Sequence, residues 1–329
     1  MTYSHSKTKF SCRLPVICAP MFIVSNYKAV IEQCLSGVIG TFPSLNARPE
    51  GSLTEWCSKI EEACLQGKKD NPDAIISPYG VNLILDPSNT RLEHDIKVIS
   101  KHKVPLVITS LRAPKEVVHE VHSWGGLVFH DAVSKRHAEK AAEAGADGII
   151  LVCSGSGGHC GSLNPFAFIA ETRQWYDGVI VLAGSISSGR DVLAARILGA
   201  DFSYMGTRFI ATQDTVVPQD YKEQIVSSGT ADIMLSSYFT GIPANYLKKS
   251  IELAGLNPNS MPDVPQSFGF SKVADEKDST NQSVDKKVWK DIWSAGHGAA
   301  AINDIPTVPE LVDNLCRQYE ESKAMIAGL

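Results

Sequence analysis

The 329-residue sequence predicts an α/β protein built as a (β/α)8 TIM barrel, with a helical addition near the C-terminus. Eight short apolar runs rich in β-branched residues alternate with stretches of helical character, as expected of buried parallel strands and the helices that cover them. The competing fold is a doubly wound open sheet. It is disfavoured because no Gly-x-Gly-x-x-Gly turn follows the first run, where Ala19-Pro20-Met21 stands instead.

The elements follow one another in regular order along the chain. The predicted strands are Val16–Ala19, Gly37–Thr41, Val81–Leu85, Val104–Ile108, Leu127–His130, Gly148–Cys153, Val179–Ala183 and Phe202–Met205. Helices predicted between them include Thr54–Gln66, Leu92–Lys101, Pro114–Trp124, Ser134–Ala144 and Gly189–Leu198. The phrase Gly-Ala-Asp occurs at 145–147 and again at 199–201, before the sixth and eighth strands. Glycine is favoured where a helix ends, so we expect two equivalent turns on the face opposite the active site.

The alternation stops after Thr212. Residues 213–256 carry apolar residues at helical spacing, residues 274–287 are mostly polar and predict an exposed loop, and residues 306–326 predict a final amphipathic helix. We therefore expect a barrel core over residues 1–212 and a helical addition with an exposed polar loop over residues 213–295. A C-terminal segment and helix, residues 296–329, would pack back on the barrel.

Composition and charge narrow the function classes. Hydrophobic residues make up 43% of the chain, enough for a sizeable core, and the formal net charge is −5. This charge and the absence of any basic run argue against a nucleic-acid partner or an anionic membrane surface. The first residues are polar and no apolar run is long enough to span a bilayer, so we expect a cytoplasmic protein without a membrane partner.

The most informative segment is Ser154–Gly161, which reads Ser-Gly-Ser-Gly-Gly-His-Cys-Gly and follows the sixth strand. It holds His159 among glycines at the carboxyl end of a strand, where barrel enzymes carry their active sites. The ordinary pKa of histidine suits proton transfer near neutral pH, so we predict that His159 is catalytic, against the alternative of a structural histidine. A nucleophilic pair with Cys160 is disfavoured because neighbours on a loop usually point apart. No metal is expected, because metal-ligand spacing is missing.

Two glycine-containing turns follow the last two strands. Gly184 and Ser185 follow the seventh strand, and Gly206 and Thr207 follow the eighth. Barrels commonly bind phosphate with the loops after these strands, where backbone N–H groups at helix N-termini point at the anion. Glycine lets the phosphate approach the backbone. The alternative is two ordinary turns with helix caps.

Taken together, these motifs resemble the FMN-dependent nitronate monooxygenases, long called 2-nitropropane dioxygenases. The resemblance covers residues 14–212 and, more weakly, the rest of the chain. The residues that carry it are Ala19-Pro20-Met21, Asn82, Gly157-Gly158-His159-Cys160-Gly161, Ala183-Gly184-Ser185-Ile186, Gly199-Ala200-Asp201, Met205-Gly206-Thr207-Arg208-Phe209 and Ser294-Ala295-Gly296-His297-Gly298.

The resemblance implies FMN as the cofactor, with His159 facing the substrate. The phosphate of FMN would lie on Ser185, Gly206 and Thr207. The isoalloxazine ring would lie near Ala19, Pro20, Met21 and Asn82, and Gly157 and Gly158 would give the ring room. His130, Ala183 and Gly184 complete the expected cofactor-binding set; some members place a lysine near the flavin where this chain has His130-Asp131. Two further departures are Ser185, where the family usually has glycine, and His297, where it usually has glutamine.

The activity implied is oxidation of a nitroalkane or nitronate by the flavin, which then reacts with O2. The partners expected are therefore a small-molecule substrate and O2, with homo-oligomerisation left open. Three alternatives remain: an FMN-dependent NAD(P)H-using reductase of the enoyl-acyl-carrier-protein or quinone type, a flavin-binding protein without catalysis, and a flavin-free barrel isomerase.

Overall fold

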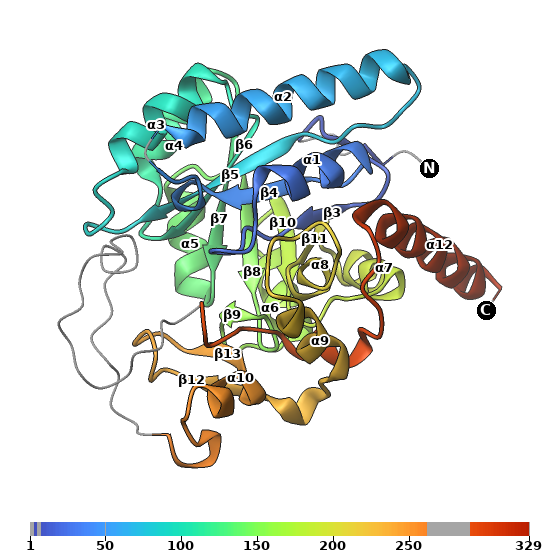
Figure 1. Cartoon of the computed structure of the whole chain (residues 1–329). Coiled ribbons are helices and arrows are strands. Elements are labelled where there is room, and N and C mark those ends of the chain that lie inside the picture. The colour runs from blue at the N-terminus through green and yellow to red at the C-terminus, as the bar shows by residue number, and fades with distance from the viewer. Residues whose placement is uncertain (1–2, 5–7, 50, 262–289, 329) are drawn as a thin grey trace.

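A computed structural model describes residues 3–4, 8–49, 51–261 and 290–328 of the chain. At its centre, parallel strands form a barrel surrounded by helices (Figure 1). The barrel strands are β3 (Val16–Cys18), β4 (Gly40–Pro43), β5 (Tyr79–Leu85), β6 (Leu106–Leu111), β7 (Leu127–Ala132), β8 (Gly148–Val152), β10 (Val179–Ala183) and β11 (Phe202–Met205). Each corresponds to one predicted strand, so the predicted TIM barrel is confirmed.

The barrel closes between its first two strands. The eight barrel strands form one continuous ladder in the order β3-β11-β10-β8-β7-β6-β5-β4, which has the first two strands at its ends. Ile39, just before β4, donates from its backbone N–H to the carbonyl oxygen of Val16 at 3.0 Å, and its own carbonyl accepts from Cys18 at 2.8 Å. These two bonds join the ends of the ladder in parallel register. The short strands β1 (Tyr3–Ser4) and β2 (Ser11–Cys12) pair with each other before the barrel begins.

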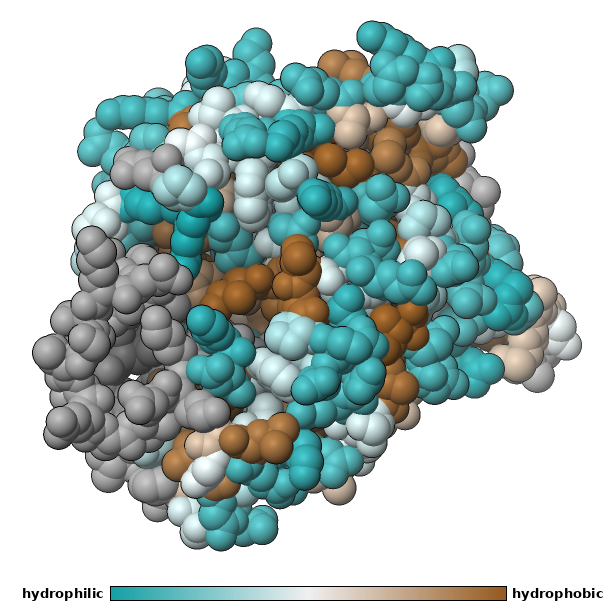
Figure 2. Space-filling model, viewed as in Figure 1, coloured by the Kyte–Doolittle hydropathy of each residue, from teal (hydrophilic) through white to brown (hydrophobic). Residues whose placement is uncertain are grey.

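Helices cover the outside of the barrel. They are α1 (Tyr27–Leu35), α2 (Ser52–Asp70), α3 (Leu92–Lys101), α4 (Lys115–Ser123), α5 (Lys135–Glu143), α6 (Pro165–Arg173), α7 (Gly189–Leu198) and the short α8 (Thr207–Ile210). The predicted C-terminal helix is present as α12 (Val308–Ala327), which lies beside α7 (Figure 1). Its Leu311 and Leu315 are buried in one cluster with Val192 of α7. Most of the face shown in Figure 2 is hydrophilic, and apolar side chains come to the surface in its middle.

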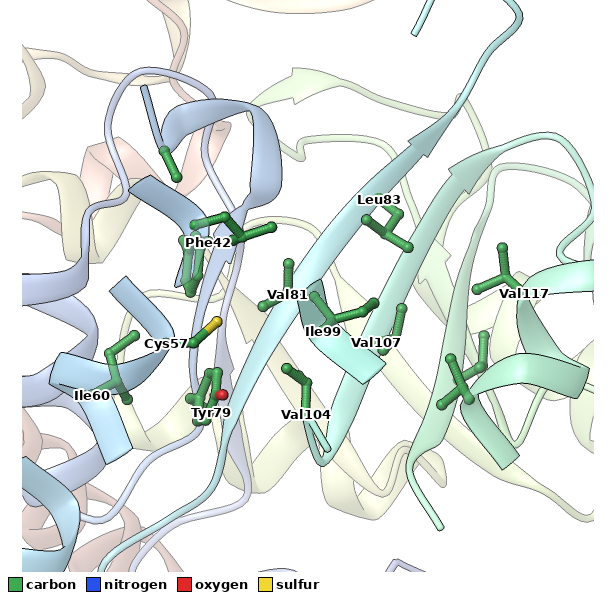
Figure 3. Packing of buried hydrophobic residues seen from close by; sticks show 14 of the residues in the cluster. Phe42, Cys57, Ile60, Tyr79, Val81, Leu83, Ile99, Val104, Val107 and Val117 are labelled. Atoms are coloured by element: carbon green, nitrogen blue, oxygen red, sulfur yellow. The ribbon is translucent and has the colours of Figure 1, made fainter. Parts of the chain in front are cut away.

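Side-chain alternation along each strand separates the outer core from the interior of the barrel. On β5, Tyr79, Val81 and Leu83 pack outward against the helices, in one cluster with Ile60 of α2 and Ile99 of α3 (Figure 3). The intervening residues point the other way because successive side chains of a strand face opposite sides. Asn82 therefore faces the interior, where it lines a cavity.

The two Gly-Ala-Asp phrases form equivalent turns, as predicted. Gly145 and Gly199 have φ angles of +88° and +106°, in the left-handed region that favours glycine. The following aspartates, Asp147 and Asp201, accept hydrogen bonds from the backbone of the preceding neighbour strand, each at 2.8 Å. These turns fix the amino ends of β8 and β11 and so leave the carboxyl ends for the site.

The addition is only partly helical. It contains α9 (Gln219–Ser227), α10 (Lys248–Leu253) and the 3-10 turns η2 (Thr230–Asp232) and η3 (Pro258–Ser260), and a further turn, η4 (His297–Ala301), begins the C-terminal part. The expectation of helix throughout residues 213–256 is wrong for β12 (Ile233–Ser236) and β13 (Ala244–Leu247), which pair antiparallel. β13 also pairs with β9 (Gly158–His159), a partner so distant in sequence that local spacing does not reveal it.

The boundaries at residues 212 and 295 stay a prediction, and the loop predicted at 274–287 lies outside the described residues. Within the described part of the chain, every helix is too short or too polar to cross a membrane.

Candidate active site

A cavity of about 720 Å³ opens at the carboxyl ends of the barrel strands. The loops after the strands, the hairpin β12–β13 and the segment 294–298 contribute to its wall. All but one of the residues predicted for the site line this cavity: His159 with Ala19, Pro20, Met21, Asn82, Gly157, Gly158, Ala183, Gly184, Ser185, Gly206 and Thr207. The fold therefore brings together segments that lie far apart in the sequence.

His130 is the exception, and this part of the predicted site disagrees with the structure. On β7 the flanking residue Phe129 packs inside the barrel, so His130 points outward to the helix layer. There its Nδ1 lies 2.8 Å from Oγ1 of Thr109, and burial lowers the pKa of His130 to about 4. The next residue, Asp131, lines the cavity instead.

Asp131 belongs to a polar cluster that sequence reasoning missed. Oγ of Ser110 donates to its Oδ2 at 2.6 Å, and Nδ2 of Asn82 donates to Ser110 at 2.9 Å. Burial of the carboxyl group raises the pKa of Asp131 to about 6. Oδ1 of Asp131 and the hydroxyl of Tyr204, which also lines the cavity, are among the buried polar atoms that have no hydrogen-bond partner in the described residues. The sequence signal that could have indicated this cluster is an acidic residue near the carboxyl end of an apolar strand.

The turn after β11 leaves room and donors for an anion. In the described structure the backbone N–H groups of Gly206 and Thr207 have no hydrogen-bond acceptor. A Cβ atom on Gly206 would lie 3.4 Å from Sδ of Met21, an ordinary contact distance, and its φ of −105° suits any residue. The protein itself therefore does not require glycine at position 206, which agrees with space kept for a bound group.

The turn after β10 differs from the expectation of a helix N-terminus open to phosphate. The carboxylate of Asp191 accepts from the backbone N–H groups of Ser187 and Ser188 at 3.0 and 2.9 Å. It thus caps α7 from within the first turn. Only the earlier part of this loop, Gly184 and Ser185, remains for an anion, and both residues line the cavity.

His159 lies on β9, at the junction of the barrel and the hairpin. Its Nε2 is 3.1 Å from Oγ1 of Thr240, and burial lowers the pKa of His159 to about 4. The imidazole is therefore neutral at pH 7 and able to accept a proton. Burial also raises the pKa of Cys160 to about 11, so its thiol stays protonated, which argues against a nucleophilic Cys–His pair.

Gly157, near His159, is needed for packing as well as for leaving space in the cavity. A Cβ atom on Gly157 would lie 2.8 Å from the backbone nitrogen of Gly296. Gly296 in turn donates from its N–H to Oγ1 of Thr207 at 2.9 Å. The C-terminal segment therefore closes over the loops of β8 and β11, which requires glycine at position 157 whatever the cavity binds.

These features fit FMN. The free N–H groups of Gly206 and Thr207 suit its phosphate, and a side chain at position 206 would fill the space beside them. The orphaned Oδ1 of Asp131 and hydroxyl of Tyr204 suit the polar edge of its ring.

Comparison with known proteins agrees with this fold. A family model described as nitronate monooxygenase matches residues 49–318. The (3aS,4S,5R,7aS)-5-hydroxy-7a-methyl-1-oxo-octahydro-1H-indene-4-carboxyl-CoA dehydrogenase of Rhodococcus jostii (strain RHA1) is 29% identical over 174 residues, which is 53% of this chain and 49% of that protein. A probable nitronate monooxygenase of Staphylococcus aureus (strain Newman) is 28% identical over 214 residues, 60% of each chain. The match to the first of these relatives thus spans about half of its length.

Among solved structures, FabK from Thermotoga maritima superposes with a TM-score of 0.75 at 24% identity, over 96% of each chain. This likeness shows that the two proteins share a fold.

Proposed function

This chain belongs to the nitronate monooxygenase family, and from that premise we propose that it is an FMN-dependent oxidoreductase that oxidises nitroalkanes or nitronates with O2. The observation that carries the proposal is the neutral His159 in the wall of the same cavity as the free N–H groups of Gly206 and Thr207. One cavity thus offers a proton acceptor and an anion site, which a flavin enzyme acting on a weak carbon acid needs.

The residues divide into a binding group and a reacting group. Ser185, Gly206 and Thr207 would hold the phosphate of FMN, and Asn82 and Asp131 the polar edge of its ring. When bound, FMN supplies the redox chemistry by taking electrons from the substrate and passing them to O2. Ala19, Pro20 and Met21 line the cavity after β3 and would exclude water from the ring.

His159 would perform the proton transfer. A neutral nitroalkane must lose a proton from the carbon beside its nitro group, and the unprotonated imidazole accepts it. A nitronate already lacks that proton, so its oxidation would not need His159 as a base. A flavin-binding protein without catalysis would have no need of a base in this position.

The alternative that a specific observation favours is an NAD(P)H-using reductase or a dehydrogenase. The Rhodococcus relative is named as a dehydrogenase of a CoA-linked acid, not as a monooxygenase. The cavity described here has donors for a phosphate but no feature that selects O2 over another electron acceptor.

Two measurements test the proposal. Heat release and chromatography of the flavin from gently purified protein should identify FMN; FAD, or no flavin at all, contradicts the assignment. The enzyme is then mixed without oxygen with NADH or with a nitronate, and flavin absorbance is followed. Bleaching by the nitronate and slow reaction with NADH support a nitronate monooxygenase, whereas fast bleaching by NADH alone supports the reductase.

A further inference from the structure

A row of hydrogen bonds across three neighbouring strands ends at the carboxyl group of Asp131. Asn82 on β5 donates to Oγ of Ser110 on β6 at 2.9 Å, and Ser110 donates to Oδ2 of Asp131 on β7 at 2.6 Å. All three side chains line the cavity. The row therefore fixes the position of an acidic group in the wall of the proposed flavin site.

No cationic side chain offsets this acidic group within the described lining of the cavity. That lining contains Asp131 as its one aspartate or glutamate, and it contains neither lysine nor arginine. Burial, with a smaller contribution from Asp131, holds the pKa of Tyr204 well above its usual range, so Tyr204 is neutral. Burial also keeps His159 and Cys160 neutral at pH 8. When it is ionised, Asp131 thus gives the cavity wall an uncompensated negative charge.

The charge of a flavin changes when it is reduced. A reduced flavin that has taken up two electrons and one proton carries one negative charge more than the oxidised flavin. A carboxylate in the same cavity repels that added charge, and the repulsion is stronger in a partly desolvated site than in water. The oxidised flavin gains no such charge, so the carboxylate affects the reduced form more.

We propose that the Asp131 carboxylate lowers the reduction potential of the FMN held in this cavity and thereby restricts which electron donors can reduce it. The inference rests on the proposed function, because it requires FMN in the site. At a lower potential a donor must be a stronger reductant to reduce the flavin, and the reduced flavin passes its electrons on more readily. Asp131 would act by its charge, so its removal should change the potential without requiring a change in the fold.

The direct test is the midpoint potential of the bound flavin at pH 8. Dithionite titration of the FMN-loaded protein, with a redox dye of known potential, measures the midpoint of wild type and of Asp131→Asn, which has nearly the same shape. The variant should have a midpoint about 30 mV higher, which for a two-electron couple corresponds to a tenfold change in the equilibrium constant. Asp73→Asn, at an exposed aspartate, is the matched control and should leave the midpoint unchanged.

A second titration at pH 5 separates charge from shape. Burial raises the pKa of Asp131 to about 6, so most of the carboxyl groups are protonated and neutral at pH 5. The difference between wild type and Asp131→Asn should therefore shrink toward zero at this pH. The other titratable side chains of the described lining, which are His137, His159, Cys160, Tyr204 and Tyr221, are common to both proteins.

Three results would overturn the inference. The first is an equal midpoint in wild type and Asp131→Asn at pH 8. The second is a difference that stays the same at pH 5, since it would come from shape or contact. The third is that Asp131→Asn and a second neutral variant, Asp131→Ser, stay folded but bind no FMN, which would make Asp131 a residue required for binding.

The inference and the proposed function fail separately. If the protein binds FMN but does not oxidise nitroalkanes or nitronates, the proposed substrate is wrong, and a higher midpoint in Asp131→Asn still supports the role of Asp131. If the wild type oxidises these substrates but the midpoint does not respond to Asp131→Asn, the inference alone fails. A protein that binds no FMN contradicts both.

Discussion

Oγ of Ser110 lies 2.6 Å from Oδ2 of Asp131 and donates a hydrogen bond to it across neighbouring strands β6 and β7. This is the single hydrogen bond to the Asp131 carboxyl group among the described residues, and its other oxygen is buried without a partner. One neutral hydrogen bond does not offset the cost of burying a charge. The charged form of the Asp131 carboxyl group is therefore destabilised in the folded protein, and the group ionises only above a pKa of about 6.

The first prediction is that Asp131→Asn stabilises the protein at alkaline pH. The unfolded carboxyl ionises near its ordinary pKa of about 3.9, whereas the folded one resists ionisation until about 6. Between these values the folded state binds more protons, so wild-type stability falls as pH rises through this window and the loss is complete above it. The variant should exceed wild type by about 2–3 kcal/mol at pH 8, with the difference vanishing below pH 4.

Urea unfolding from pH 4 to 8 measures this difference, on flavin-free protein so that ligand binding does not enter. Asp73→Asn, at an exposed aspartate, is the matched control and should show no such pH-dependent gain. If the Asp131 and Asp73 variants behave alike, Asp131 is solvated or paired in solution.

The second prediction concerns Gly206. Gly206→Val should remove flavin while the barrel stays folded, because the new side chain fits the protein but fills the space beside the free N–H groups. Gly206→Ala should give an intermediate loss. Flavin occupancy is measured as the ratio of flavin absorbance to protein absorbance, and folding is measured by circular dichroism.

Gly229 gives a matched control, since its φ is −95° and a Cβ atom there would lie 3.7 Å from the nearest atom. Gly229→Val should keep its flavin. Full occupancy in Gly206→Val would show that the phosphate lies elsewhere.

The third prediction concerns Asp191, which caps α7 beside the site. Asp191→Ala should destabilise the protein by about 1–2 kcal/mol, because it leaves the N–H groups of Ser187 and Ser188 without their acceptor. Thermal or urea unfolding measures the loss, with exposed Asp177→Ala as control. A loss no larger than that of the control would mean that water replaces the carboxylate at no cost.

The barrel could be predicted because each strand is a local apolar run, and the left-handed turns at Gly145 and Gly199 have a local signature. It is harder to predict which residues of a strand face the interior of the barrel, because both faces of a barrel strand are buried and apolar. This explains the choice of His130 over Asp131: a shift of one residue moves a side chain to the opposite face.

The hairpin and the contact of Thr240 with His159 could not be predicted from the sequence, for a different reason. Thr240 meets His159 across 81 positions of sequence, and β13 has β9 as one of its partners. Such contacts depend on how the addition folds back on the barrel, which the spacing of apolar residues within 213–256 does not encode.

The last prediction tests His159 as a base. His159→Asn should keep flavin, because the free N–H groups that suit the phosphate belong to Gly206 and Thr207, in a different loop. It should lower kcat/KM for a neutral nitroalkane by about 10²–10⁴-fold, the usual contribution of a general base. Oxidation of the preformed nitronate should fall much less, since that anion has already lost its proton. Equal losses on both substrates would mean that His159 only positions substrate. No loss on either, as expected for the control His119→Asn at an exposed histidine of α4, would make His159 a structural residue.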